Sequence, residues 1–297
     1  MMGRRGAALG VSILALGIVF ACTALVDTSG LAGRAQPVED AAKAPDAPAP
    51  PDAAEASTGE AGACPSSCAA GGRCISSVCV PSVGLLAWWT FDQTGPQILD
   101  VSGGGNHGTN QGAKPAPGKS GKGIDLTTNA CVLVPESASL RLADATGLTM
   151  MAWTKVSGCA EPTRDHGMLL NKEDTYELGV ECAGSVLTLQ EAVTSEPAGW
   201  SWHGSAALTP ATWQHVAVTW DGTTMRHYVD RAERDSHPQS GTIRAQSSGL
   251  GIGCRDVGVD GSAAATREWI AAAVDEVAIY GRALSAAELR AYVEATR

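Results

Sequence analysis

Two tryptophans and a histidine stand close together in the stretch PAGWSWHGS, and their side chains are of the kinds that bind sugars. A sugar ring stacks on a flat aromatic surface while nearby polar groups hydrogen-bond its hydroxyls. In an extended strand Trp200 and Trp202 project from one face, with Ser201 and His203 on the other. No Val or Ile surrounds them, which favours an open face. We therefore predict a ligand-binding site at Trp200, Trp202 and His203, the alternative being that both tryptophans are core residues.

The loop DVSGGGNHG is rich in oxygen donors. Asp100, Ser102 and Asn106 alternate with glycines, which let backbone carbonyls converge without side-chain clashes. Ca²⁺ prefers about six to eight oxygen ligands, many of them carbonyls, so the loop is a candidate calcium site. The alternative is that Asp100 and Asn106 only hydrogen-bond their own turn, as Asx residues do.

No pattern typical of catalysis occurs in the sequence. Glycosidases need two facing carboxylates, and the acids of NKEDTYELGVE (Glu173, Asp174, Glu177 and Glu181) are interpreted as a solvated hairpin. The motifs G-x-S-x-G, H-E-x-x-H and G-x-x-x-x-G-K-S/T are absent. The net charge of −10 argues against a nucleic-acid partner, because phosphate binding needs a basic surface. The sequence therefore predicts a protein that is not an enzyme.

The stretch WQHVAVTWDGTTMRHYVD predicts two strands joined by a tight turn at Asp221-Gly222. Aromatic residues at strand spacing are usually core, so Trp213 and Trp220 are predicted to face the interior. His215 and His227 have no further metal ligands at a suitable local spacing. They are interpreted as surface or hydrogen-bonded histidines rather than ligands.

The cysteines indicate an oxidising compartment. Apart from Cys22 there are eight, an even number, and four of them form the cluster CPSSCAAGGRCISSVC: Cys64, Cys68, Cys74 and Cys79. Their spacing favours two disulfides over a zinc site. The other four are Cys131, Cys159, Cys182 and Cys254. Cys159 and Cys182 end two strands on either side of an antiparallel arm, which favours a Cys159–Cys182 bridge and leaves Cys131 with Cys254.

The N-terminus predicts export. Arg4 and Arg5 precede a short apolar run, as in a signal peptide over residues 1–21, and VFAC resembles a bacterial lipobox with Cys22 as the lipidated residue. An ordinary signal peptide cut elsewhere is the alternative. This resemblance implies attachment to a membrane through an N-terminal lipid, at a bacterial outer membrane or cell surface. Residues 22–63 are rich in Ala, Pro and acids and are predicted to be a disordered tether.

Short apolar runs separated by turn signals fill residues 84–297, after a small disulfide-rich module at 64–81. Such spacing is typical of an antiparallel sandwich or jelly roll. A helix is expected only in ALSAAELRAYVEATR, where Ser285 and Glu288 form a capping box and Leu284 and Leu289 a hydrophobic staple. We expect this helix to plug one end of the sandwich.

The order of GLLAWWTFD, DVSGGGNHGTNQGA, GKSGKGIDL, CVLVPES, LTMMAWTKV, TWQHVAVTWDGTTMRHYVD, LGIGC and AVDEVAIYGRALSAAEL resembles the laminin-G-like jelly roll of the concanavalin A-like lectin/glucanase superfamily. The resemblance implies an all-β fold of two antiparallel sheets with LAWWTF beside VDEVAIY. It further implies a structural Ca²⁺ held by Asp100, Asn106 and Asp275. VDRAERD departs from the strand, Asn-Gly turn and strand usual in that family.

Together these patterns predict a surface-anchored, non-catalytic recognition module whose partner is a glycan or another surface polymer. Superfamily resemblance specifies fold more than function. A protein-binding adhesion or display domain is the alternative, and a glycosidase is a more distant one.

Overall fold

The computed structural model describes residues 68, 72–75, 78–93, 95–127, 129–143, 145, 147–160, 165–263 and 266–297. They belong to one compact unit that extends to Arg297. The structure does not describe the predicted signal peptide, the predicted lipidation site Cys22, the predicted tether or Cys64.

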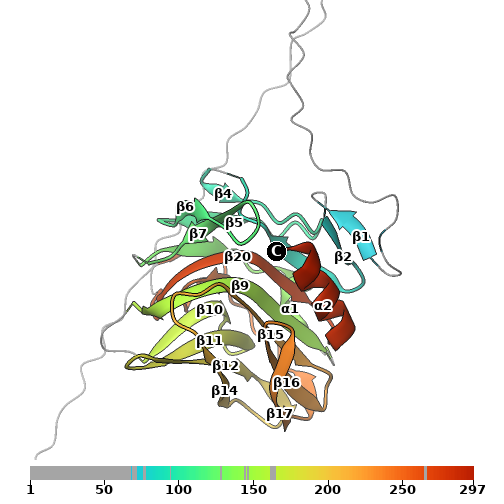
Figure 1. The fold of residues 1–297 in the computed structure, drawn as a ribbon. Coiled ribbons are helices and arrows are strands. Elements are labelled where there is room, and N and C mark those ends of the chain that lie inside the picture. Colours follow the sequence, from blue (N-terminus) through green and yellow to red (C-terminus); the bar gives the residue numbers. More distant parts are fainter. Residues whose placement is uncertain are drawn as a thin grey trace, which may run out of the picture. The chain divides into compact units, whose positions relative to one another are not determined.

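Two eight-stranded antiparallel sheets form a sandwich, as the sequence predicted (Figure 1). The first, sheet I, has the order β14 (Trp202–Leu208), β12 (Val186–Val193), β11 (Tyr176–Ala183), β10 (His166–Lys172), β19 (Leu250–Ile252), β8 (Cys131–Val134), β5 (Gly108–Gln111) and β4 (Gln97–Ile98). The second, sheet II, has the order β17 (Ala232–Pro238), β16 (Thr224–Val229), β15 (Gln214–Trp220), β9 (Leu148–Cys159), β20 (Ile270–Tyr280), β7 (Lys122–Asp125) and β6 (Lys114–Pro117), and β3 (Leu85–Trp89) pairs with β20.

Smaller elements complete the described fold. They are the hairpin of β1 (Gly72–Ile75) and β2 (Val78–Pro81), the pair β13 (Ser195–Pro197) and β18 (Gly241–Ile243), and the helices α1 (Ala138–Arg141) and α2 (Ala286–Ala295). No helix among the described residues is long and apolar enough to cross a membrane.

The main core lies between the two sheets and is built by alternation along the strands. Val216, Val218 and Trp220 of β15 all face it and are essentially inaccessible to solvent. Each fully buried side chain of this kind contributes about 1.5–3 kcal/mol relative to exposure. The indole of Trp220 donates to the carbonyl of Gln239 at 2.7 Å, so its one polar atom is satisfied. The predicted hairpin is confirmed, with β15 paired to β16 across the Asp221-Gly222 turn.

The VDRAERD segment forms a second hairpin without an Asn-Gly turn. Val229 pairs with Ala232, and the two residues between them, Asp230 and Arg231, have φ angles of 51° and 72°. A two-residue turn with positive φ at both positions has the twist that matches antiparallel strands. The strand–turn–strand order is therefore kept with different turn residues.

Helix α2 covers part of the outer face of sheet II. Its capping box is present, with the Glu288 amide donating to Ser285 Oγ at 3.3 Å and the Ser285 amide to Glu288 Oε2 at 2.9 Å. Leu289 and Tyr292 pack with outward-facing residues of sheet II, among them Trp88. The expectation that this helix plugs an end of the sandwich is wrong, because Trp88, Tyr228 and Tyr280 form an apolar surface on the outer face of sheet II, and the helix packs on it.

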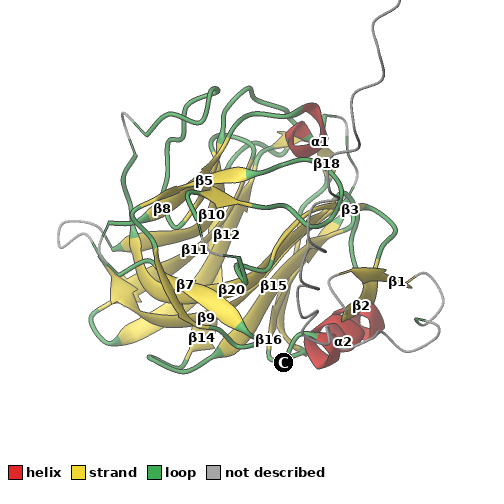
Figure 2. Cartoon of the chain, turned by 90° about the horizontal axis from the view of Figure 1, so that it is seen from above, coloured by secondary structure: helices red, strands yellow, loops and turns green. Residues whose placement is uncertain are grey.

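The N-terminal hairpin shares this second apolar cluster. Ile75 and Val80 are buried in it together with Leu284 and Leu289. Figure 2 shows β2 beside α2. The bridge Cys68–Cys79 ties the hairpin to the chain before it.

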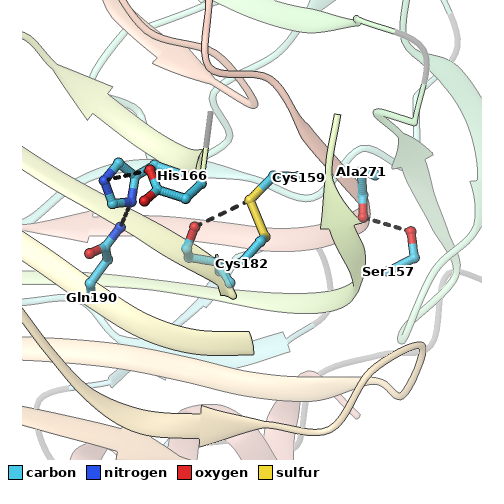
Figure 3. Close-up of a disulfide and its surroundings, with 8 residues drawn as sticks. Ser157, Cys159, His166, Cys182, Gln190 and Ala271 are labelled. Atoms are coloured by element: carbon cyan, nitrogen blue, oxygen red, sulfur yellow. Dashed lines mark hydrogen bonds and ion pairs between the residues drawn. A yellow bond between two sulfur atoms is a disulfide. The ribbon is translucent and has the colours of Figure 1, made fainter. Parts of the chain in front are cut away.

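Two further disulfides have the pairing that the sequence favoured, Cys131–Cys254 and Cys159–Cys182. Cys159 is the last residue of β9 in sheet II, and Cys182 lies in β11 of sheet I. The second bridge therefore joins the two sheets covalently (Figure 3).

Candidate functional site

A groove of about 270 Å³ crosses the outer face of sheet II on the half that α2 leaves open. Its walls come from β6, β7, β9 and β20 and from the loop before β15. The lining residues are Ala116, Pro117, Asp125, Thr127, Lys155, Ser157, Ala211, Trp213 and Ala273. We call this surface the Trp213 groove.

Trp213 directly precedes β15, which begins at Gln214. Two hydrogen bonds fix the preceding loop: Ala211 N donates to the carbonyl of Val156 at 2.7 Å, and Thr209 N donates to Gln214 Oε1 at 2.6 Å. Trp213 is half-buried rather than enclosed. The prediction that it is a core residue is wrong, because Trp213 is an odd number of residues from Val216, Val218 and Trp220, and period-two alternation therefore places it on the outer face of sheet II.

The rest of the groove combines small apolar residues with polar ones. Ala116 and Ala273 have short side chains, which keep the surface beside the indole low. Lys155 and Ser157 are exposed on β9, and the Ser157 hydroxyl donates to the carbonyl of Ala271 at 2.8 Å (Figure 3). Asp125 Oδ1 accepts from the amide of Thr127 at 2.8 Å, which leaves Oδ2 available. An aromatic face with hydrogen-bonding groups around it is the arrangement that binds a sugar ring.

Trp200 and Trp202 form a second aromatic surface, on sheet I. Their rings meet edge to face with centroids 5.7 Å apart, and both are half-buried. The ring of His166 stacks parallel to Trp202 at 6.1 Å, and its Nδ1 lies 2.8 Å from Gln190 Nε2 (Figure 3). Trp202 passes close to Gly179, where an added Cβ would lie 3.6 Å from the indole. The structure therefore brings the two predicted tryptophans together and adds His166 and Gln190 to them.

His203, the third residue predicted for this site, points to the other face of β14. It lies opposite Glu191 in the strand register, and its Nδ1 is 3.9 Å from Glu191 Oε1. His203 therefore belongs to a polar group between the sheets and not to the tryptophan surface.

The residues predicted to bind calcium lie in two places: Asp100 and Asn106 in the loop between β4 and β5, and Asp275 in strand β20. Asp100 Oδ1 accepts from the amides of Trp88 and Ser102, each at 2.9 Å, and Oδ2 accepts from that of Asn106 at 2.9 Å. The Asn106 side chain donates to the carbonyl of Leu86 at 2.9 Å. These bonds match the alternative interpretation of the sequence, in which Asp100 and Asn106 hydrogen-bond the backbone of their own turn.

Asp275 accepts hydrogen bonds from the loop between β6 and β7. Its Oδ2 accepts from the amides of Lys119 and Ser120 at 2.8 and 3.0 Å, and its Oδ1 from that of Glu276 at 2.8 Å. Burial raises the pKa of Asp275 to about 7, against the effect of these amide bonds. Asp100 and Asp275 share no hydrogen-bond partner among the described residues, so calcium bound by both remains a prediction.

The segment NKEDTYELGVE forms the predicted hairpin, between β10 and β11, and Asp174 is exposed, but its acids are not all solvated as the sequence was interpreted. Glu177 is fully buried, and Arg255 lies 2.8 Å from Glu173, 3.3 Å from Glu177 and 3.2 Å from Glu268. Burial raises the pKa of Glu177 to about 9, with Arg255 acting in the opposite direction. Arg255, which comes from a distant loop, pairs with Glu173 and Glu268, and the raised pKa means that Glu177 is buried as a neutral acid near pH 7.

His215 is buried as well and packs edge-on against Trp153, with centroids 5.4 Å apart. Burial lowers its pKa to about 3, so the ring is neutral at physiological pH. The other histidine of the hairpin, His227, contacts Glu191.

Comparison with known proteins identifies the fold. The family model of the concanavalin A-like lectin/glucanases superfamily matches residues 126–290, more than half of the chain. No curated protein sequence matches the chain.

Several solved structures are similar in fold. The binding domain of Paraclostridial Mosquitocidal Protein 1 is 16% identical, with a TM-score of 0.51 over 70% of this chain and 51% of that chain. The binding domain of botulinum neurotoxin serotype C1 is 10% identical, with a TM-score of 0.52 over 72% of this chain and 52% of that chain. A structure of botulinum neurotoxin type C, whose cell entry depends on two ganglioside molecules, is 9% identical, with a TM-score of 0.51 over 72% of this chain and 51% of that chain. This chain thus spans about half the length of these structures, and the likeness extends to the fold alone.

Proposed function

Because the chain belongs to the concanavalin A-like lectin/glucanases superfamily, we propose that its sandwich is a non-catalytic recognition module that binds a glycan or another surface polymer. The observation that carries the proposal is the Trp213 groove. It joins a half-buried indole to a low surface of small side chains and to polar groups. Binding modules of this superfamily fold differ in their loops, and Trp213 stands on a loop that two hydrogen bonds fix in place.

A sugar ring in this groove stacks on the exposed part of Trp213. Its hydroxyls then reach the Asp125 carboxylate, the Lys155 ammonium and the Ser157 hydroxyl. Aromatic anchors of this kind dominate binding energy in recognition sites, whereas exposed polar contacts contribute less each. The groove is a channel across strands rather than a closed pocket, which suits an internal segment of a polymer.

The Trp200 and Trp202 surface is a second contact for the same polymer. It faces outward from sheet I, whereas the Trp213 groove faces outward from sheet II. A long polymer or two separate chains could engage both, and such bivalence raises the overall affinity without new contacts.

Anchoring at a cell surface completes the proposal. A lipid on Cys22 attaches the protein to a bacterial outer membrane, and the tether of residues 22–63 separates the sandwich from the lipid surface. The basic and apolar N-terminal run and the four-cysteine cluster support export. Mass spectrometry of the mature N-terminus tests this: a diacylglyceryl group on Cys22 is expected, and an unmodified N-terminus elsewhere would refute it.

The experiment for the groove is a binding screen on a glycan and polysaccharide panel, in calcium and in EDTA, followed by variants against the best ligand. Trp213→Ala is expected to weaken binding by more than tenfold, a loss of more than about 1.4 kcal/mol. Val259→Ala, an exposed apolar residue outside both surfaces, is the control and should bind as the wild type does.

The variants also separate the two surfaces. Trp202→Ala is expected to have a smaller effect than Trp213→Ala. Unchanged binding in Trp213→Ala together with a loss in Trp202→Ala would place the site on sheet I. No binding of the wild type to any glycan would refute the proposal and favour a protein-binding adhesion domain.

A further inference from the structure

Four side chains from four strands meet between the two sheets, at the edge where β14 and β17 are the last strands. Glu191 of β12 and His203 of β14 come from sheet I, and His227 of β16 and His237 of β17 come from sheet II. We call these four residues the Glu191 cluster. Each sheet supplies two of them.

The donor atoms of the cluster converge on the Glu191 carboxylate. Oε2 contacts Nε2 of His227. Oε1 lies 3.4 Å from Nε2 of His237 and 3.9 Å from Nδ1 of His203. The rings of His203 and His237 stack with centroids 3.8 Å apart, so both direct a nitrogen at the same oxygen.

The cluster is only partly satisfied by hydrogen bonds. Among the described residues, neither Glu191 Oε1 nor His203 Nδ1 has a hydrogen-bond partner of acceptable geometry, although both atoms are buried. The side chain of Glu191 is completely inaccessible to solvent. A buried carboxylate is costly unless charges and hydrogen bonds compensate it. In the part of the chain that the structure describes, the ion-pair partners of Glu191 are histidines, and no Lys or Arg side chain pairs with it.

A transition-metal ion satisfies these atoms together. Imidazole nitrogens and a carboxylate oxygen are ligands of Zn²⁺, which favours four-coordinate tetrahedral sites. With metal–ligand bonds of about 2.0–2.1 Å, tetrahedral ligands lie about 3.4 Å from one another. The ligand atoms of Glu191, His203 and His237 all lie within 4.8 Å of one another, and so do those of His227, Asp235 and His237.

We propose that Glu191, His203 and His237 bind a divalent transition-metal ion, Zn²⁺ foremost, between the two sheets, while His227 holds the second oxygen of the Glu191 carboxylate. The ion reaches the site from the open edge, where the side chain of His203 is 43% exposed and that of His237 15%. Rotation of the exposed His203 ring brings its nitrogen to the ion, and Asp235 stands beside the cluster as a further carboxylate. The three protein ligands come from β12, β14 and β17, so the ion joins the edge strands of the two sheets, and a water molecule or Asp235 completes four-coordination.

The first test is titration of the purified protein with Zn²⁺ after removal of metal by a chelator, with no glycan present. We expect one ion per chain with sub-micromolar affinity, and a rise in the melting temperature. Co²⁺ in place of Zn²⁺ should give the visible absorption bands of a tetrahedral site. These measurements do not depend on the sugar-binding proposal, so either proposal can fail alone.

Variants locate the ion. His203→Gln, at the exposed side of the cluster, should leave the fold intact and weaken Zn²⁺ binding by about 100-fold or more, beyond the 10–100-fold typical of groups that only support a ligand. His107→Gln, an exposed histidine outside the cluster, is the matched control and should bind as the wild type does. Equal affinity in His203→Gln and the wild type, or no saturable binding, would overturn the proposal and leave a carboxylate–imidazole cluster without metal.

Discussion

The Asp100 loop and the Glu191 cluster both bury a carboxylate, but they surround it differently. Asp100 receives three backbone amides from Trp88, Ser102 and Asn106. Glu191 faces three histidine side chains, and its Oε1 has no hydrogen bond among the described residues. A carboxylate whose oxygens all accept backbone amides holds the conformation of its loop. A carboxylate that faces imidazole nitrogens from several strands can instead share a cation with them. Whether the carboxylate oxygens already have hydrogen-bond donors thus distinguishes a structural carboxylate from a candidate metal ligand better than the residue type does.

The largest effect is expected at the Asp100 loop. Asp100→Ala leaves three amides without their acceptor in a buried loop, and hydrogen bonds to a charged group are worth about 1.5–3 kcal/mol each. We expect a loss of about 3–5 kcal/mol in the free energy of unfolding, measured by denaturant titration. Asp260→Ala removes a comparable bond to Ser262 on an exposed loop and should change stability by less than about 0.5 kcal/mol. Similar losses in both variants would contradict the comparison.

The next effect concerns Zn²⁺ and the Glu191 cluster. An ion at about 100 times its dissociation constant adds about 2.7 kcal/mol of stability. This corresponds to a rise of about 5–10 °C in melting temperature for a domain of this size. Glu191→Gln keeps the shape and a carbonyl acceptor but removes the negative charge, so it should abolish this rise. Glu233→Gln, a carboxylate on the exposed strand β17, should retain it. A rise that persists in Glu191→Gln would place the ion elsewhere.

A third carboxylate gives a pH test of intermediate size. Glu276 is buried and accepts one bond from the indole of Trp88, and burial, together with the charge of Asp275, raises its pKa to about 9. Because the folded state holds this proton more tightly than the unfolded one, stability is full below about pH 4.5 and falls as pH rises toward 9. Melting temperatures across this range should decline, and Glu276→Gln should flatten the decline. An identical slope in Glu276→Gln would show that other groups, such as Glu177, cause it.

The smallest effect is expected from calcium at Asp100, Asn106 and Asp275. The carboxylate oxygens already accept backbone amides, so an ion would add to bonds that exist without it. We expect calorimetry to show a rise of about 1–2 °C in calcium relative to EDTA, equivalent to about 0.5 kcal/mol. Asn106→Ala should remove it. An increase in melting temperature as large as that expected with Zn²⁺ would show that the Asp100 loop binds an ion, and would contradict the proposed difference between this loop and the Glu191 cluster.

Much of the fold was predictable because its determinants are local. Period-two alternation located β15 and β16, and Ser285 with Glu288 located the start of α2. The cysteine pairing was predicted correctly, but the prediction placed Cys159 and Cys182 at one edge of the same sheet, whereas they lie in different sheets. The position of Trp213 was predicted wrongly although the signal was local: it is seven residues from Trp220, so the two indoles lie on opposite faces of sheet II.

The clusters of charge were missed because their members are far apart in the sequence. Glu177 appears solvated in its own segment, but it is buried as a neutral acid beside Arg255, which comes from a later loop. Likewise His227 has no second ligand nearby in the sequence, and Glu191, His203 and His237 reach it through strand pairing and the stacking of two sheets. One local signal was present: His227 and His237 flank a short turn, which brings their strands together.

The packing of the β1–β2 hairpin against α2 has a mechanical consequence. Ile75 and Val80 are held by Leu284 and Leu289, so the first described strands and the last helix form one joint. A force applied at the N-terminal side therefore acts first on this joint and on the loop closed by Cys68–Cys79, and only then on the two sheets. Single-molecule pulling should show an early, separate extension as the joint opens while the sandwich stays folded; rupture in a single step would mean that the load reaches the sheets directly.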